Sequence, residues 1–346
     1  MHFILRQVSD NFDCNVYQTL IKNYSTLFSH DDSHKDITIT FTNSDKKLKA
    51  HKCILKAASP ILAAKLSKDT KILQISDVKA DIFEIMLSGI YLNHITSKGI
   101  DIFQAYDLYE ASVRYQIDDI SAVASDIMKR RSVALNCQFL MQAAIKYKIR
   151  DLEETVKETF ASAAYMALSF YVSYKVDDEA FHRLFALDEL KIQSEFELYL
   201  AVETMYDIRD ERIYPKCLSQ IRFLSMDIAD LMNCDLLSSE EKLAIAENAD
   251  AIRNKRSTKI QMPKRLSAEP KPRNFLVVDQ KERKIFWTAI MLKCRNHKKY
   301  LEMFYKNMEI PEKEREATEK LIISGRTPKF ANKERIEEIA KNIFKF

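Results

Sequence analysis

Glycine is scarce in this chain. Only Gly89, Gly99 and Gly325 occur among 346 residues, whereas an average protein composition would give about 24. Loops that hold the phosphates of nucleotides need two or three glycines within a few residues, because only glycine lets the backbone approach a phosphate at positive φ. The sequence therefore excludes such a loop.

Closely spaced cysteines and long apolar runs are also lacking. The longest uncharged run, residues 159–174, has 16 residues and includes Ser and Tyr, whereas a membrane-spanning helix needs about 20 apolar residues. The apolar start of the chain is too short for a signal peptide. We therefore expect no membrane partner and a location in the cytoplasm or the nucleus. The six cysteines lie too far apart for a paired zinc motif or a compact disulfide framework; they are Cys14, Cys53, Cys137, Cys217, Cys234 and Cys294.

Signatures of catalysis are not found in the sequence. It contains no nucleophile elbow, no His-Glu-x-x-His helix and no kinase motif. Residues 30–34 read His-Asp-Asp-Ser-His, which suits a divalent metal, but a solvated turn before a strand is the more common reason for such a pattern. We therefore expect no catalytic residue, no metal, no cofactor and no enzymatic activity.

Charge is unevenly distributed along the chain. Residues 253–346 contain 25 Lys and Arg against 12 Asp and Glu, a net charge of +13, whereas residues 1–252 have 29 against 38, a net charge of −9. Between residues 253 and 273, Pro, Lys and Arg dominate, which is typical of an exposed linker. The sequence predicts an acidic body followed by a basic linker and C-terminal region.

The first part of the chain alternates between helical and strand patterns. Residues 36–42 alternate polar and apolar side chains, residues 47–50 continue this pattern after a turn, and residues 73–75 form a third short run. A period of two is the signature of a half-buried strand. Helical patterns over residues 82–92, 103–115 and 117–129 surround these strands, so the fold class of this part is α+β.

An amphipathic helix is predicted ahead of the first strand, over residues 11–28. Its apolar residues recur every three or four positions, which places them on one helical face. A second copy of the chain covering this face would give a homodimer with a two-fold interface, although the helix folding back on its own domain remains an alternative. The candidate dimerisation residues are Phe12, Val16, Leu20, Tyr24 and Leu27.

The order of motifs in this region resembles the BTB/POZ family. The resemblance covers about 90 residues and implies a homodimerisation domain over residues 1–129, with the leading helix at the partner chain. It also implies that Asp36 and Lys52 form a charged pair near a groove of the dimer. The matching segments are Asp36, Ala50-His51-Lys52-Cys53-Ile54-Leu55, Ala58-Ser59-Pro60, Leu73-Gln74-Ile75-Ser76-Asp77-Val78 and residues 83–91.

Residues 130–252 are predicted to be all-α. Helical faces recur, for example at Leu198, Ala201, Val202 and Met205, and Ser194 with Glu197 and Ser238 with Glu241 have the spacing of capping boxes. The strings at residues 136–140, 144–147, 188–195, 221–226 and 236–241 resemble the BACK domain, the helical domain that often follows BTB. The expected architecture is an α+β BTB/POZ domain, an all-α BACK domain and a basic, partly helical C-terminal tail over residues 253–346.

The combination of BTB and BACK is similar to substrate adaptors of cullin-3 ubiquitin ligases. It implies a dimeric protein-interaction adaptor that holds an unknown protein substrate beside the ligase. The tail is too short and too poor in glycine for a kelch propeller, whose blades take about 40–50 residues each. Residues 66–72 also lack the hydrophobic-x-Glu element that relatives use in docking. The residues implied to contact cullin-3 are Leu62, Lys65, Leu66, Asp69, Tyr91, Tyr106 and Tyr109.

The basic tail supports an alternative of another class. A dimeric nuclear scaffold or transcription cofactor would use the tail to contact nucleic acid or to direct nuclear import. Two basic pairs near the start of the tail loosely resemble a split import signal, namely Lys255-Arg256 and Lys264-Arg265. Binding to phosphates would weaken steeply with added salt.

Overall fold

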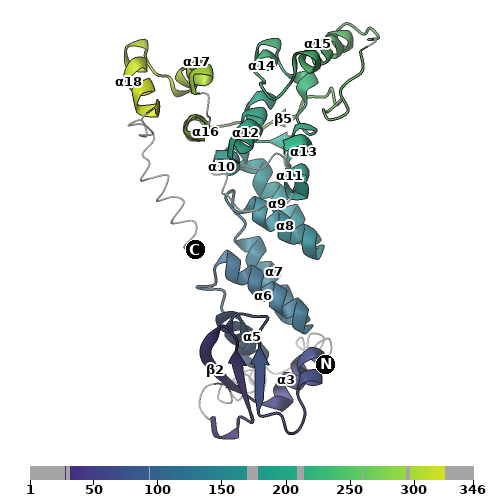
Figure 1. The fold of residues 1–346 in the computed structure, drawn as a ribbon, viewed down its shortest axis with the longest axis vertical. Coiled ribbons are helices and arrows are strands. Elements are labelled where there is room, and N and C mark those ends of the chain that lie inside the picture. Colours follow the sequence, from purple (N-terminus) through teal and green to yellow (C-terminus); the bar gives the residue numbers. More distant parts are fainter. Residues whose placement is uncertain are drawn as a thin grey trace, which may run out of the picture. The chain divides into compact units, whose positions relative to one another are not determined.

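The chain divides into two compact units at the bond between Arg131 and Ser132. The structure is a computed structural model that describes residue 28 and residues 32–92, 94–169, 178–208, 214–258, 260–293 and 297–323. We call the part through Arg131 the N-terminal unit and the part from Ser132 the helical unit (Figure 1). The described residues between 253 and 323 belong to the helical unit rather than to a separate body.

A three-stranded sheet forms the base of the N-terminal unit. Its order is β2-β1-β3, with β1 antiparallel to β2 and parallel to β3. Along β1 the side chains of Ile37, Ile39 and Phe41 are buried and alternate with the half-exposed threonines, as a period of two requires. The three predicted strands are confirmed, with bounds β1 Ile37–Phe41, β2 Ser44–Ala50 and β3 Ile72–Ile75.

Helices pack on the buried face of this sheet. The capping box of α6 is complete, because the Asp101 side chain accepts from the backbone of Phe103 and Gln104 while the Gln104 side chain accepts from the backbone of Asp101. Gly89 in α5 is needed for close packing, since a Cβ there would lie 2.9 Å from the Ile95 side chain. The bounds are η1 Asp32–His34, α3 Lys52–Ala58, α4 Pro60–Lys65, α5 Ala80–Leu92, α6 Ile102–Tyr115 and α7 Asp118–Arg130.

The first part of the helical unit consists mainly of helices, among them α12 (Glu195–Ile208), which packs against α13 (Tyr214–Leu218). Every described side chain of α12 from Glu195 to Thr204 is buried, as in a helix enclosed on all sides. The predicted capping box at Ser238 and Glu241 is confirmed. The bounds are α8 Cys137–Tyr147, α9 Arg150–Ser162, α10 Ala164–Ser169, α11 Asp178–Phe185, α12 Glu195–Ile208, α13 Tyr214–Leu218, η2 Phe223–Ser225, α14 Ile228–Met232 and α15 Ser239–Arg253.

The C-terminal region is partly helical, as predicted, and it packs within the helical unit. Helix α16 (Gln280–Lys293) lies against α10 and α12, α17 (His297–Met308) lies against α16, and α18 (Glu312–Ile323) lies against α17. Before α16, strand β5 (Asn274–Phe275) pairs in parallel with β4 (Glu189–Leu190). Strand β4 departs from the purely helical prediction for residues 130–252. A strand of two residues is too short to show a period of two in the sequence.

The segment between α15 and β5 differs from the predicted linker. Its charged residues up to Arg256 are exposed, but Leu266 is 6% exposed and Arg273 is 4% exposed. We call residues 254–273 the strap, because they run from the end of α15 to β5 and are fixed at these two buried side chains. A segment held in this way cannot act as a free linker.

Candidate functional site

Asp36 and Lys52 are brought together at the start of α3. The Asp36 carboxylate accepts a hydrogen bond from the backbone N–H of Lys52 at 2.8 Å, which satisfies a free donor of the first helical turn. The Lys52 ammonium instead donates to the carbonyl of Lys68 at 2.8 Å. The two residues therefore fix α3 and the loop before β3 through backbone groups, and their role at a dimer groove stays a prediction.

Three of the seven residues predicted to contact cullin-3 are core residues. Leu62 is 0% exposed, Leu66 is 3% exposed and Tyr91 is 3% exposed. The Tyr91 hydroxyl accepts the backbone N–H of His51 at 2.8 Å and lies 2.7 Å from His51 Nδ1, and burial raises the pKa of Tyr91 to about 12. A partner cannot reach these side chains on the folded domain, so assigning them to docking was wrong. Their apolar character reflects core packing.

The other four predicted docking residues remain at the surface. Lys65 and Asp69 are exposed, and Tyr106 and Tyr109 on α6 are half-exposed. Helix α4 packs against α6, and the Lys65 ammonium lies 5.4 Å from the centre of the Tyr115 ring. Partial burial raises the pKa of Tyr109. We call Lys65, Asp69, Tyr106 and Tyr109 the docking surface.

The predicted dimerisation residues cannot be placed. Phe12, Val16, Leu20, Tyr24 and Leu27 all lie outside the described residues. Phe28 is described, and its ring lies 5.2 Å from the ring of Tyr91. The half-buried residue at the end of the predicted helix therefore contacts the core of the N-terminal unit, and the dimer role of the helix stays a prediction.

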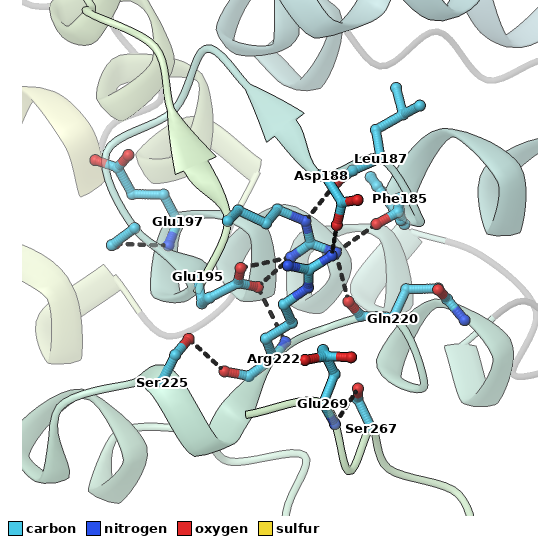
Figure 2. Close-up of polar contacts among 12 residues, drawn as sticks. Phe185, Leu187, Asp188, Glu195, Glu197, Gln220, Arg222, Ser225, Ser267 and Glu269 are labelled. Atoms are coloured by element: carbon cyan, nitrogen blue, oxygen red, sulfur yellow. Dashed lines mark hydrogen bonds and ion pairs between the residues drawn. The ribbon is translucent and has the colours of Figure 1, made fainter. Parts of the chain in front are cut away.

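The helical unit contains a buried ion pair between Arg273 and Glu195, with side chains 1% and 2% exposed. Figure 2 shows Glu195, Gln220 and Asp188 around the guanidinium groups at this centre. Arg273 donates to both oxygens of Glu195, to the carbonyls of Leu187 at 2.8 Å and Gln220 at 2.6 Å, and to that of Phe185. All guanidinium N–H groups can thus be satisfied without water, although burial lowers the pKa of Arg273.

Arg222 adds further hydrogen bonds to this centre. Its backbone N–H donates to Glu195 at 3.0 Å, and its side chain donates to the carbonyl of Lys271 at 3.1 Å and to Asp188. The Arg222 guanidinium holds the pKa of Asp188 below its ordinary value. Two arginines, one from the strap and one from before η2, therefore fix the strap and the loop before β4 around one carboxylate.

Two further buried glutamates on α12 are held by aromatic side chains. Glu197 accepts from Tyr165, from the backbone of Gln193 at 2.9 Å and from the Trp287 indole at 3.2 Å, yet burial raises its pKa. Glu203 accepts from Tyr199 at 2.8 Å and Tyr300 at 2.5 Å. Trp287 and Tyr300 lie in α16 and α17, so the C-terminal region supplies partners to both carboxylates.

The predicted capping box at Ser194 is only half formed. The Ser194 hydroxyl accepts the backbone N–H of Glu197 at 3.3 Å, but the Glu197 side chain binds Gln193, Tyr165 and Trp287 instead of returning to the backbone of Ser194. Sequence spacing alone does not distinguish a capping glutamate from a buried one. No signal near Glu197 in the sequence marks it as buried, because its partner Trp287 lies 90 positions away.

The predicted import or nucleic-acid residues are divided between solvent and acidic partners. Lys255 and Lys264 are exposed. Arg256 pairs with Asp250, and Arg265 binds both carboxylate oxygens of Glu241 at 2.6 and 2.5 Å. These two arginines of the strap therefore neutralise acidic side chains of the helical unit.

Within the described residues, no group of three or more His, Cys, Asp and Glu side chains is arranged to hold a metal ion. No helix in the described part of the chain is both long and apolar enough to cross a membrane.

Comparisons with known proteins identify the N-terminal unit. The family model of the BTB/POZ domain matches residues 25–132, so this region is a BTB/POZ domain, as the sequence motifs predicted. The chain is also similar to Kelch-like protein 31 of Danio rerio, with 21% identity over 203 residues, which is 56% of this chain and 31% of that protein. This chain thus spans less than a third of its relative.

Among solved structures, the chain is similar to the BTB domain of zebrafish PATZ1. The match has 14% sequence identity and a TM-score of 0.30, and it covers 35% of this chain and 98% of that chain.

Proposed function

We propose that the protein is a dimeric protein-interaction adaptor that acts as a substrate-recognition subunit of a cullin-3 ubiquitin ligase. The observation that carries this proposal is a BTB/POZ domain joined in one chain to a helical unit, with similarity to a Kelch-like protein beyond the BTB/POZ region. In this proposal the helical unit corresponds to a BACK domain. The protein acts by binding rather than by catalysis.

The mechanism is proximity. A dimer presents two substrate sites and two ligase sites in one assembly, and the second contact of each pair forms at a raised effective concentration. The C-terminal region is part of the helical unit, so substrate recognition in this proposal takes place on the helical unit as a whole.

The docking surface is the proposed contact with cullin-3. Tyrosine side chains are frequent anchors of interfaces, because they bury a large area and keep a polar end. Tyr106 and Tyr109 lie three residues apart on α6, so their side chains share one helical face. The loop before β3 is ordered by two hydrogen bonds between Ser67 and Thr70, at 3.0 and 2.8 Å, and it offers Asp69 in place of the hydrophobic-x-Glu element.

Light scattering and calorimetry on the full chain test this proposal. We expect a dimer that binds the cullin-3 N-terminal region, and Tyr109→Ala should weaken this binding about tenfold or more. The matched control is Tyr147→Ala, which removes a half-exposed tyrosine from α8 in the helical unit and should leave binding unchanged.

The outcomes separate dimerisation from docking. Leu20→Asp should convert the dimer to a monomer if the predicted leading helix lies between the two copies. A dimer that shows no heat of binding with cullin-3 contradicts the ligase role. Such a result remains consistent with a dimeric protein-interaction domain. A monomeric wild-type chain contradicts the adaptor mechanism itself.

The alternative function, a nuclear scaffold or transcription cofactor, is less well supported than the adaptor function. Phosphate binding needs free cationic side chains, and two of the four candidate residues, Arg256 and Arg265, already pair with Asp250 and Glu241. Binding of the full chain to duplex DNA that falls steeply between low and moderate salt would favour this alternative.

A further inference from the structure

Three serines of the chain follow pairs of basic residues. Ser132 follows Lys129-Arg130-Arg131, Ser257 follows Lys255-Arg256, and Ser267 follows Lys264-Arg265-Leu266. Protein kinases that have an acidic substrate cleft select a serine by basic side chains a few residues upstream, since charge patterns determine kinase specificity. All three serines have basic residues within three positions upstream, and the structure separates them further.

Ser132 is a poor kinase substrate because its upstream residues are helical. Lys129 and Arg130 form the last turn of α7, so they cannot extend into a cleft beside the serine without unwinding the helix. The Ser132 hydroxyl also donates to the hydroxyl of Thr159 at 3.2 Å. The oxygen that would receive the phosphate is therefore held in place by the fold.

Ser257 lies just after α15, where a phosphate is unfavourable. The backbone N–H of Arg256 donates to the carbonyl of Ala251 at 2.8 Å, which closes the end of the helix, and the Arg256 side chain pairs with Asp250. A dianion at a helix C-terminus is repelled by the free carbonyls and by a neighbouring carboxylate.

Ser267 lies in the part of the strap that has neither helix nor strand. Pro263, Pro270 and Pro272 prevent regular structure in this segment. The Ser267 oxygen accepts the backbone N–H of Glu269 at 3.2 Å (Figure 2), so this bond leaves the hydroxyl proton available. Lys264, Ala268 and Glu269 are exposed on either side.

We propose that Ser267 is a phosphorylation site for a protein kinase that recognises the exposed Lys264 upstream of it. The Ser267 oxygen attacks the γ-phosphorus of Mg-ATP supplied in the kinase, the bond from this phosphorus to the bridging oxygen breaks and ADP leaves. The hydroxyl proton passes to a carboxylate of the kinase. The proposal does not depend on the ligase role of the protein.

The phosphate changes the contacts of the strap. Arg265 binds Glu241 and the carbonyl of Leu236 at 3.1 Å, and a phosphate two residues away is a stronger partner for its guanidinium than a carboxylate. Loss of Arg265 from Glu241 removes one of the contacts that join the strap to α15. Arg273 stays in place, because its side chain and that of its ion-pair partner Glu195 are buried.

The test uses the full chain with Mg-ATP and the catalytic subunit of a serine kinase that prefers basic residues. We expect one phosphate per chain, found by mass spectrometry in the peptide that contains Ser267. Ser267→Ala should abolish it, whereas Ser132→Ala and Ser257→Ala should retain it. Lys264→Ala, which removes an exposed side chain, should slow the reaction about tenfold.

Two results would overturn the proposal. One is phosphate incorporation that persists in Ser267→Ala. The other is a folded chain that takes up no phosphate while a synthetic peptide of residues 260–272 is phosphorylated, since the docked strap then hides the site. As a second readout, tryptic cleavage after Arg265 should become faster in the phosphorylated protein, and Glu241→Gln without phosphate should reproduce this acceleration.

Discussion

The two units of the protein bury different kinds of side chain. In the described part of the N-terminal unit, the buried polar residues are Ser59 and Ser112, whose hydroxyls donate to the carbonyls of Tyr115 and Tyr109. In the described part of the helical unit, five charged side chains are buried, namely Glu195, Glu197, Glu203, Arg222 and Arg273.

This difference shows how each unit specifies its packing. An apolar core accepts many arrangements of similar volume, and shape alone selects among them. A buried carboxylate accepts only an arrangement that supplies its donors, because an unpaired buried charge is costly. The C-terminal region supplies those donors through Arg273, Trp287 and Tyr300, so its path along the helical unit is fixed by charge as well as by shape.

The largest predicted effect comes from ending the chain at Arg253. This truncation removes one partner from each of three buried glutamates, namely Arg273 from Glu195, Trp287 from Glu197 and Tyr300 from Glu203. Breaking the buried ion pair costs about 3–5 kcal/mol and each lost hydrogen bond to a buried carboxylate about 1–3 kcal/mol, and together these losses approach the total stability of a domain. We expect the helical unit to lose its cooperative unfolding transition in circular dichroism. A chain ending at Ile323 serves as the control, and a cooperative helical unit in the shorter chain would contradict the integral role of the C-terminal region.

Arg273→Met should destabilise the helical unit by about 3–5 kcal/mol, since it leaves Glu195 buried without a cation. Urea unfolding measures this change. The double variant Arg273→Met with Glu195→Met removes both charges and should recover part of the loss. If the single and double variants are equally unstable, packing volume rather than charge holds the strap.

Leu62→Ala tests the apolar core of the N-terminal unit. This side chain is fully buried, and its truncation should cost about 2–5 kcal/mol. The loss should be independent of pH, because no charged group loses a partner. A loss that varies between pH 5 and pH 8 would mean that the core of the N-terminal unit depends on charge after all.

Two glutamates of the helical unit should respond to pH with opposite signs. Arg265 lowers the pKa of Glu241, so this pair stabilises the fold above the ordinary value near 4.5 and loses its contribution as pH falls through the lowered pKa. Burial raises the pKa of Glu197, so its ionisation destabilises the fold as pH rises from its ordinary value through the raised one. Carboxyl NMR titration, with Arg265→Ala as comparison, measures both shifts, and a Glu241 pKa that does not move in this variant contradicts the pairing.

The smallest predicted effect is at the exposed end of the strap. Arg256→Ala removes an ion pair with Asp250 whose side chains are 61% and 52% exposed, and exposed pairs contribute about 0–1 kcal/mol. Urea unfolding at low and high salt should show a small loss that salt abolishes. A loss as large as that of Arg273→Met would remove the distinction between the buried and exposed ends of the strap.

Sequence periodicity was sufficient to locate the strands of the N-terminal unit and its later helices. The strands at residues 37–41, 44–50 and 72–75 and the helices that follow them were predicted within a few residues, because alternation reports which face a strand buries. The parallel pairing of β1 with β3 was not predicted, since it joins residues more than 30 positions apart. Assigning Tyr91 to a surface also failed, because an aromatic side chain serves a core and an interface equally well.

The sequence by itself determined the order of the elements, the BTB/POZ domain, and the contrast between an acidic body and a basic C-terminal region. These follow from local patterns, in which each residue is interpreted with its neighbours. Only the tertiary structure decided that the basic region neutralises the acidic body of its own chain, with Arg273 at Glu195 and Arg265 at Glu241. A charge pattern gives the sign of a partner but not its position, and a carboxylate is paired only where folding removes it from water beside a cation.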